Sequence, residues 1–332
     1  MRKIILAVVL FVGIIFVVGR FSEVESIVKT LKKGDWRYLI TALIMILLWF
    51  VSIAASYQAI FQSLGINEKL SRLTMVSAAA TFINTIAPSG GIGGMTVFIS
   101  ESRQNGNTGA RAMVAGALYV IYNYLSFFIV LALGLIVLIR RDNLNITQII
   151  ASCILFLIFG GMIFLLYIGM QSEQKLADIL AWLANTGNRI IPNFILRQNI
   201  SIEKARGFAH DAVRGLEELR TNPKDLISPL IFAVINKGIL ILLFFLMFKA
   251  FNVPVSIGTL LAGVSLAYLF RIVSPTPSGV GIVEGVLALS LRSMYVSGND
   301  ALVISLAYRG FTFWVPFLVG GIAFKGLGSP SS

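Results

Sequence analysis

RIVSPTPSGVGIVEG, residues 271–285, is the stretch that decides how the rest of this chain folds. Pro275, Pro277, Gly279 and Gly281 interrupt what is otherwise a long apolar segment. Proline removes a backbone donor and clashes with the preceding helical turn, so a continuous helix does not run through these residues. Broken backbone at membrane depth is tolerated only where protein buries it or where it lines a wet cavity. The stretch therefore predicts a broken helical hairpin within a membrane protein.

A weaker copy of this break occurs earlier, where residues 86–94 read IAPSGGIGG after another apolar run. We expect the first hairpin to have arms at residues 73–87 and 95–100, and the second to have arms at 257–273 and 281–294. At about 1.5 Å per residue the longer first arm reaches only about 20–25 Å, short of a hydrocarbon core of roughly 30 Å. Two readings stay open: re-entrant hairpins, or pairs of short tilted spans.

The composition predicts an all-α polytopic membrane protein. Of 332 residues, 57% are hydrophobic and 13% are charged, against roughly 45–50% and about 25% in soluble domains. One cysteine, Cys153, and one histidine, His210, are too few for a zinc site or a Cys/His nucleophile. We therefore expect no metal, no cofactor and no enzymatic activity. The net charge of +12 fits basic loops facing anionic lipid, so we expect no nucleic-acid partner.

Apolar runs predict about six full spans in addition to the two hairpins. The N-terminal run resembles a signal peptide but lacks a small-x-small cleavage site, so we interpret it as an uncleaved span. Ser22 begins a capping box, which predicts a short amphipathic helix lying in the interface. The predicted spans are residues 4–19, 36–61, 110–139, 149–170, 226–248 and 301–324.

The two breaks indicate an internal repeat within a single transmembrane domain, residues 1–332. APSG at residues 87–90 matches TPSG at residues 276–279. Three predicted spans separate the hairpins, and an odd number of crossings makes the repeat inverted, as in many secondary transporters. The repeats would cover residues 1–140 and 147–328, with a cytoplasmic amphipathic insert at 171–225 that contains a helix at 201–220. Because this charged insert is more easily left in the cytoplasm, we expect both termini there, in a plasma (inner) membrane protein.

The second half also carries family motifs. SPTPSGVGIVEG, followed by ALVISLAYRGFTFWVP at residues 301–316, resembles the lysylphosphatidylglycerol synthase transmembrane region family. The matching residues are Pro277, Gly279, Gly281, Glu284 and Gly285 in the break, and Tyr308, Arg309, Trp314 and Pro316 in the last span. Ala117 and Leu118 stand where the family often has Glu-Arg. The resemblance implies a flippase-like membrane domain without the family's aminoacyl-transferase domain.

These features lead to the hypothesis of lipid translocation through a polar cavity built from both breaks. Arginine can bind a headgroup phosphate, and a carboxylate can pair with arginine or with a cationic headgroup. Glycines let the backbone approach a ligand, and freed N–H groups attract phosphate. The candidate headgroup site comprises Arg271, Glu284, Arg309, Ser278, Gly279, Gly281, Asn84, Ser89, Gly90 and Gly91. The expected partner is a membrane lipid with a phosphate-containing headgroup, and self-association is left open.

Several of these residues could instead have purely structural roles. Glu284 and Arg309 would also make a purely structural ion pair. Asn84, Ser89 and Asn236 are more typical of helix–helix hydrogen bonds, and the tyrosines at 119, 122 and 124 are more typical of packing. The alternative functions are a secondary transporter of a small solute or ion, and a membrane enzyme acting on lipid headgroups.

Overall fold

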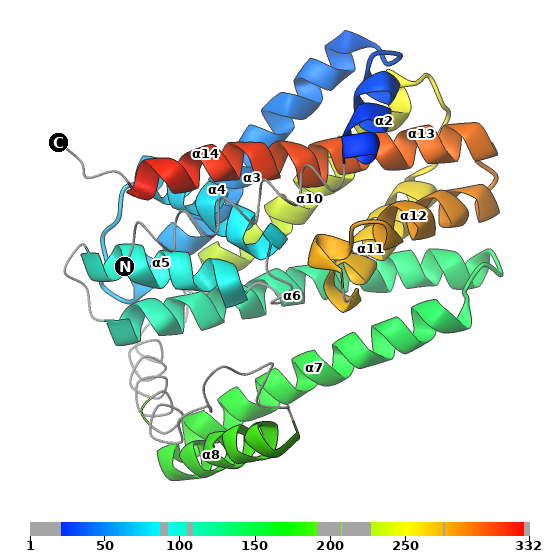
Figure 1. The fold of residues 1–332 in the computed structure, drawn as a ribbon. Coiled ribbons are helices and arrows are strands. Elements are labelled where there is room, and N and C mark those ends of the chain that lie inside the picture. The colour runs from blue at the N-terminus through cyan, green and yellow to red at the C-terminus, as the bar shows by residue number, and fades with distance from the viewer. Residues whose placement is uncertain are drawn as a thin grey trace.

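The computed structural model describes residues 21–86, 92–104, 109–190, 207, 227–274 and 276–328. In these ranges the chain forms helices and no strands, which confirms the predicted all-α class (Figure 1). The helices are α2 Phe21–Leu31, α3 Trp36–Ser63, α4 Leu70–Ile86, α5 Ile92–Gln104, α6 Gly109–Arg140, α7 Ile146–Gln171, α8 Glu173–Ile190, α10 Ile227–Ala250, α11 Ile257–Val273, α12 Ile282–Ser293, α13 Gly298–Arg309 and α14 Val315–Gly328. A 3₁₀ turn, η2 Pro277–Gly279, and a π-helical turn, η3 Gly310–Trp314, complete the described elements.

Five helical segments are long and apolar enough to cross a membrane. They are α3, residues 111–140 of α6, residues 146–169 of α7, α10, and the continuous run 298–327 through α13, η3 and α14. Each corresponds to a predicted span. The sixth predicted span, residues 4–19, lies outside the described residues.

The last span contains a feature that the sequence did not predict. Its helix widens into the π turn η3 directly after Arg309, and π turns inside helices often mark functional sites. Helix α2 packs over this turn, with Ile27 only 4% exposed against Phe313, Trp314 and Val280. The apolar face predicted to lie in the membrane interface therefore contacts protein. Ser22 already lies within α2, so its predicted role as N-cap is wrong.

The two hairpins approach each other from opposite ends of the bundle (Figure 1). Helices α4 and α5 form the first, and α11 and α12 form the second. The second break reaches the first hairpin inside the bundle, where the Ser278 hydroxyl donates to the backbone carbonyl of Asn84 on α4 at 3.5 Å. All four arms are 17 residues or shorter. This arrangement fits re-entrant hairpins.

The packing partners in the two halves correspond to one another. Helix α4 of the first hairpin packs along α14, and α11 of the second packs along α6. Helices α3 and α10, which precede the two hairpins, pack against each other. This exchange of equivalent partners is the pattern expected for an inverted repeat.

Helices α7 and α8 do not take part in this exchange of partners. Helix α7 packs mainly against α11 and α8, and α8 forms the first part of the predicted insert at 171–225. The predicted amphipathic helix at 201–220 lies outside the described residues, apart from the single position Gly207.

The backbone of the second break needs its glycines. Ser278 has φ 48°, Gly279 has φ 73° and Gly281 has φ 84°, all in the left-handed region that favours glycine. A Cβ atom on Gly279 would lie 3.0 Å from the Cα of Arg271. The break therefore folds back tightly onto the end of α11.

Candidate functional site

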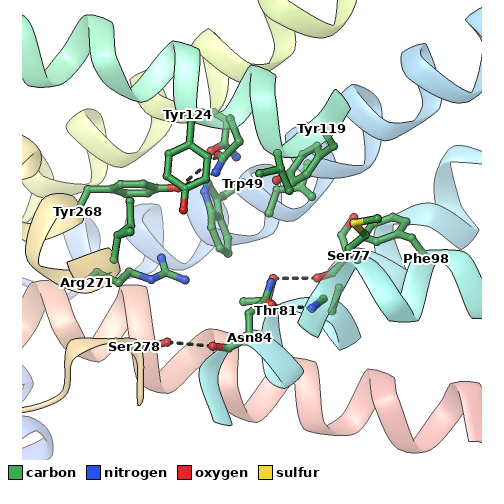
Figure 2. Close-up of a pocket in the computed structure, with 18 of the residues that line it drawn as sticks. Trp49, Ser77, Thr81, Asn84, Phe98, Tyr119, Tyr124, Tyr268, Arg271 and Ser278 are labelled. Atoms are coloured by element: carbon green, nitrogen blue, oxygen red, sulfur yellow. Dashed lines mark hydrogen bonds between the residues drawn. The ribbon is translucent and has the colours of Figure 1, made fainter. Parts of the chain in front are cut away.

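A cavity of about 140 Å³ lies between the helices of the first hairpin and the second break (Figure 2). Its walls come from α3, α4, α5, α6, α10, α11 and the turn at η2. Its polar lining consists of Ser77, Thr81, Asn84, Asn123, Asn236, Arg271, Ser274, Thr276 and Ser278. Its aromatic lining consists of Trp49, Tyr57, Phe98, Tyr119, Tyr124 and Tyr268. Among the described residues that line it, Arg271 alone carries a formal charge, and that charge is positive.

Arg271 is placed by the way α11 ends. The helix stops at Val273, two residues before Pro275, because proline disfavours helical backbone in the residue before it. Arg271 thus lies in the last turn, and its side chain lines the cavity (Figure 2). Within the described part of the chain its guanidinium makes no hydrogen bond or ion pair. The guanidinium carbon lies 5.8 Å from the centroid of the Tyr268 ring.

A buried polar cluster stands behind Arg271 and joins three helices. The Nζ of Lys237 donates to the Oδ1 of Asn123 at 2.6 Å and to the hydroxyl of Tyr268 at 2.9 Å. The Nδ2 of Asn123 also donates to the Tyr268 hydroxyl at 3.1 Å. Lys237 is only 3% exposed and sits 4.1 Å from the centroid of the Tyr268 ring. These contacts fix the ring beside which Arg271 lies.

Aromatic side chains line much of the rest of the cavity. The ring of Tyr57 stacks on Phe98 at 3.5 Å and on Tyr119 at 4.1 Å between centroids, which joins α3, α5 and α6. Trp49 on α3 is 6% exposed, and its indole N–H has no hydrogen-bond partner among the described residues. Stacked aromatic rings tolerate both apolar chains and polar tips. The cavity therefore combines an amphipathic wall with a cationic one.

Glu284 and Arg309 form a separate, sealed unit behind the second break. The Nε of Arg309 donates to the Oε1 of Glu284 at 2.6 Å, and its Nη2 donates to the carbonyl of Ser278 at 3.1 Å. The Oε2 of Glu284 accepts from the backbone N–H of Gly281 at 2.6 Å. Arg309 is 2% exposed, and neither side chain lines the cavity. This pair ties the last span to the break.

The first hairpin has its own ties. The Nε of Arg72 on α4 pairs with the Oε1 of Glu101 on α5 at 2.6 Å. The Oδ1 of Asn84 accepts from the N–H of Gly94 at 2.6 Å. Asn84 therefore links the two arms of its hairpin and also lines the cavity.

The structure thus divides the predicted site residues into three groups. Arg271, Ser278 and Asn84 line one cavity. Gly279 and Gly281 shape the break, while Glu284 and Arg309 brace it from behind. The remaining predicted residues, Ser89, Gly90 and Gly91, lie outside the described residues.

Other residues at the site were missed or interpreted differently. Lys237 had a visible signal, since an ionisable residue within an apolar span is usually functional. Trp49 had no such signal in the sequence, because a tryptophan within an apolar run is usually a packing residue. Tyr119 and Tyr124, expected to serve packing, line the cavity. Asn236 makes the expected helix–helix hydrogen bond, to the hydroxyl of Ser52 at 2.8 Å.

Comparison with known proteins bears on this fold and site. A sequence model described as the lysylphosphatidylglycerol synthase TM region matches residues 4–320. The chain belongs to this family. The family match confirms the resemblance drawn from the break and the last span. Together with the apolar helices, it shows that this is an integral membrane protein.

A curated relative extends over almost the whole chain. A UPF0104 membrane protein of Pyrococcus horikoshii is 21% identical over 328 residues, which is 97% of this chain and 96% of that protein. The two proteins are therefore similar in length as well as in sequence.

Proposed function

We propose that this member of the lysylphosphatidylglycerol synthase TM region family moves a membrane lipid with a polar headgroup between the leaflets. One observation carries the proposal: two hairpins from opposite ends of the bundle meet at one polar cavity. A charged group crossing hydrocarbon without a partner costs from roughly 3 to over 10 kcal/mol. A cavity lined by hydrogen-bonding groups lowers that cost for the headgroup while the acyl chains stay in the bilayer.

The cavity residues have distinct roles in this proposal. Arg271 binds the headgroup phosphate, because its guanidinium offers several donors. Asn84 and Ser278 bring one polar group from each hairpin. The Glu284–Arg309 pair keeps the second break in shape and does not touch the lipid. Movement of one hairpin relative to the other would open the cavity to each leaflet in turn.

The proposal extends to location and chemical class. Both termini and the segment 171–225 would lie in the cytoplasm of a cell whose plasma (inner) membrane holds the protein. The polar lining offers hydrogen bonds and one fixed charge, which suits reversible binding. We therefore propose transport without enzymatic conversion of the lipid.

A leaflet-exposure assay tests this proposal. Purified protein would be placed in vesicles with fluorescent anionic, zwitterionic and cationic lipids, and the fraction accessible to an external quencher would be followed over time. Ala80→Leu adds bulk to the cavity wall, and Ala132→Leu makes the same change on the exposed face of α6. We expect the wild type and Ala132→Leu to accelerate exchange and Ala80→Leu to slow it at matched thermal stability.

Failure of the wild type to move any lipid of the panel would overturn the proposal. A secondary transporter of a small solute or ion would then be the next candidate to test, with the same two variants.

A further inference from the structure

Two hydrogen-bond donors that face the cavity have no acceptor among the described residues. The indole N–H of Trp49 is buried without a partner among the described residues, and the guanidinium of Arg271 makes no hydrogen bond or ion pair there. Both side chains project into the same pocket (Figure 2). A buried donor left unpaired, as the Trp49 indole N–H is here, costs about 1–3 kcal/mol. Arg271 is half-buried, so part of its side chain stays exposed. Such donors are kept in a fold when something else supplies the acceptor.

The chemistry of these donors specifies the missing group. Indole nitrogen and guanidinium are donors only, and arginine keeps its charge in proteins. No described residue that lines the cavity is an aspartate or a glutamate, so the protein offers Arg271 no counter-charge there. The nearest carboxylate of the second break, Glu284, is engaged by Arg309 and by Gly281 N–H. A ligand with several acceptor atoms and negative charge is the complement of this arrangement.

Lys237 also favours a negatively charged ligand in the cavity. Its buried ammonium group lies behind Tyr268 and is bonded to neutral partners, Asn123 and Tyr268. Arg271 and Lys237 both contact the Tyr268 ring, at 5.8 Å and 4.1 Å from its centroid. Two cationic side chains around one ring, beside a cavity without a lining carboxylate, favour an anion at low dielectric.

The cavity is large enough for such a group. Its volume is about 140 Å³, whereas a single buried water needs only about 10–15 Å³. It therefore has room for a compact oxyanion together with a few waters. The aromatic stack of Tyr57, Phe98 and Tyr119 leaves room beside the oxyanion for less polar atoms.

We propose that the cavity is a phosphate-oxyanion subsite, in which Arg271 and the indole N–H of Trp49 bind the anion and Lys237 positions Tyr268 behind it. This inference rests on the proposed function in one respect: there, the anion is the phosphate of the lipid headgroup. The subsite selects phosphate-bearing ligands and gives no binding energy to a headgroup without phosphate. Free phosphate has the same chemistry, so the test must separate the two sources.

The test measures binding to the full-length protein in detergent by calorimetry. The probes are inorganic phosphate, dihexanoyl phosphatidylglycerol, dihexanoyl phosphatidylcholine and dihexanoylglycerol, which lacks phosphate. Trp49→Phe removes the N–H and keeps an aromatic ring. Its control is Trp314→Phe, because Trp314 is also 6% exposed but does not line the cavity. Arg271→Gln is matched by Lys249→Gln, at an exposed cation.

We expect the phosphate-bearing lipids to bind the wild type and dihexanoylglycerol not to bind. A hydrogen bond to a charged group is worth about 1.5–3 kcal/mol, so each cavity variant should bind about ten-fold to a hundred-fold more weakly. The two control variants should bind as the wild type does. Thermal unfolding of each variant checks that the loss of affinity does not come from misfolding.

The outcomes separate the subsite from the transport proposal. If inorganic phosphate alone binds and both cavity variants lose it, the subsite stands and the lipid assignment falls. If the wild type moves lipids in vesicles but binds dihexanoylglycerol as tightly as the phosphate-bearing lipids, the subsite is wrong and transport stands. Unchanged affinity in both Trp49→Phe and Arg271→Gln would also overturn the subsite.

Discussion

The hydroxyl of Ser278 donates to the backbone carbonyl of Asn84 at 3.5 Å, although 194 residues separate the two positions. One residue lies in the break of the second hairpin, and the other lies in the last turn of α4, the first arm of the first hairpin. The contact therefore joins two segments that enter the bundle from opposite ends (Figure 1). A polar cavity lies beside it.

A cross-link tests whether the second break meets helix α4 of the first hairpin. We expect Asn84→Cys with Ser278→Cys to form an intramolecular disulfide under mild oxidation, in a Cys153→Ser background that removes the natural thiol. Peptide mapping by mass spectrometry would detect the linked peptides, and reduction should release them. The two single-cysteine proteins serve as controls. A double variant that stays fully reduced would show that the second break does not approach α4 as described.

The Glu284–Arg309 pair should dominate the stability of the second break. Glu284→Gln leaves a buried guanidinium without its counter-charge, and breaking a buried pair in this way costs about 3–5 kcal/mol. We expect a clear fall in the thermal unfolding temperature in detergent. Glu25→Gln is the matched control, because it breaks the exposed pair of Glu25 with Lys29, and it should leave the unfolding temperature unchanged.

A double variant then identifies the cause of that loss. Glu284→Leu with Arg309→Met removes both charges, so it should recover part of the lost stability. If it is as unstable as Glu284→Gln, the unpaired charge is not the reason for the loss.

Close packing of α14 on α4 predicts a steric effect at Gly320. A Cβ atom at this position would collide with the backbone carbonyl of Ala78 and lie 2.9 Å from the Cβ of Phe82. Overpacking of this kind typically costs about 1–3 kcal/mol, so Gly320→Ala should lower the unfolding temperature. Gly160→Ala is the control, because a Cβ atom there meets nothing within 4 Å. Equal unfolding temperatures for the two variants would contradict the described packing of α14 on α4.

If the two halves form an inverted repeat, as the sequence predicts, the loops before the two hairpins lie on opposite sides of the membrane. Three long helices, α6, α7 and α10, separate the first hairpin from the second. Asn67, before the first hairpin, and Pro254, before the second, are both exposed and should face opposite sides. Single cysteines at these positions, again with Cys153→Ser, can be labelled with a membrane-impermeant maleimide in sealed vesicles. Labelling of both cysteines from the same side would overturn the inverted arrangement.

Local chemistry explains how far prediction from the sequence could go. The arm predicted at residues 257–273 agrees with α11, Ile257–Val273, because Ser256 caps its start and Pro275 follows its end. The five predicted spans that fall within the described residues agree within a few residues, since long apolar runs leave little choice of boundary. The π turn η3 was not predicted, because it depends on the packing of α2 against Gly310 and its neighbours.

By itself the sequence determined that the chain crosses the membrane repeatedly and breaks twice, because apolar runs, prolines and glycines act on their own segment of backbone. Only the tertiary structure decided what the charged side chains near the second break do. Arg271 and Arg309 both adjoin that break, yet Arg271 lines the cavity, whereas Arg309 is sealed against Glu284. The difference arises from how each helix is rotated and which neighbour it meets. Helix rotation and choice of neighbour depend on contacts between segments far apart in the chain, so they cannot be predicted from the residue pattern of one segment.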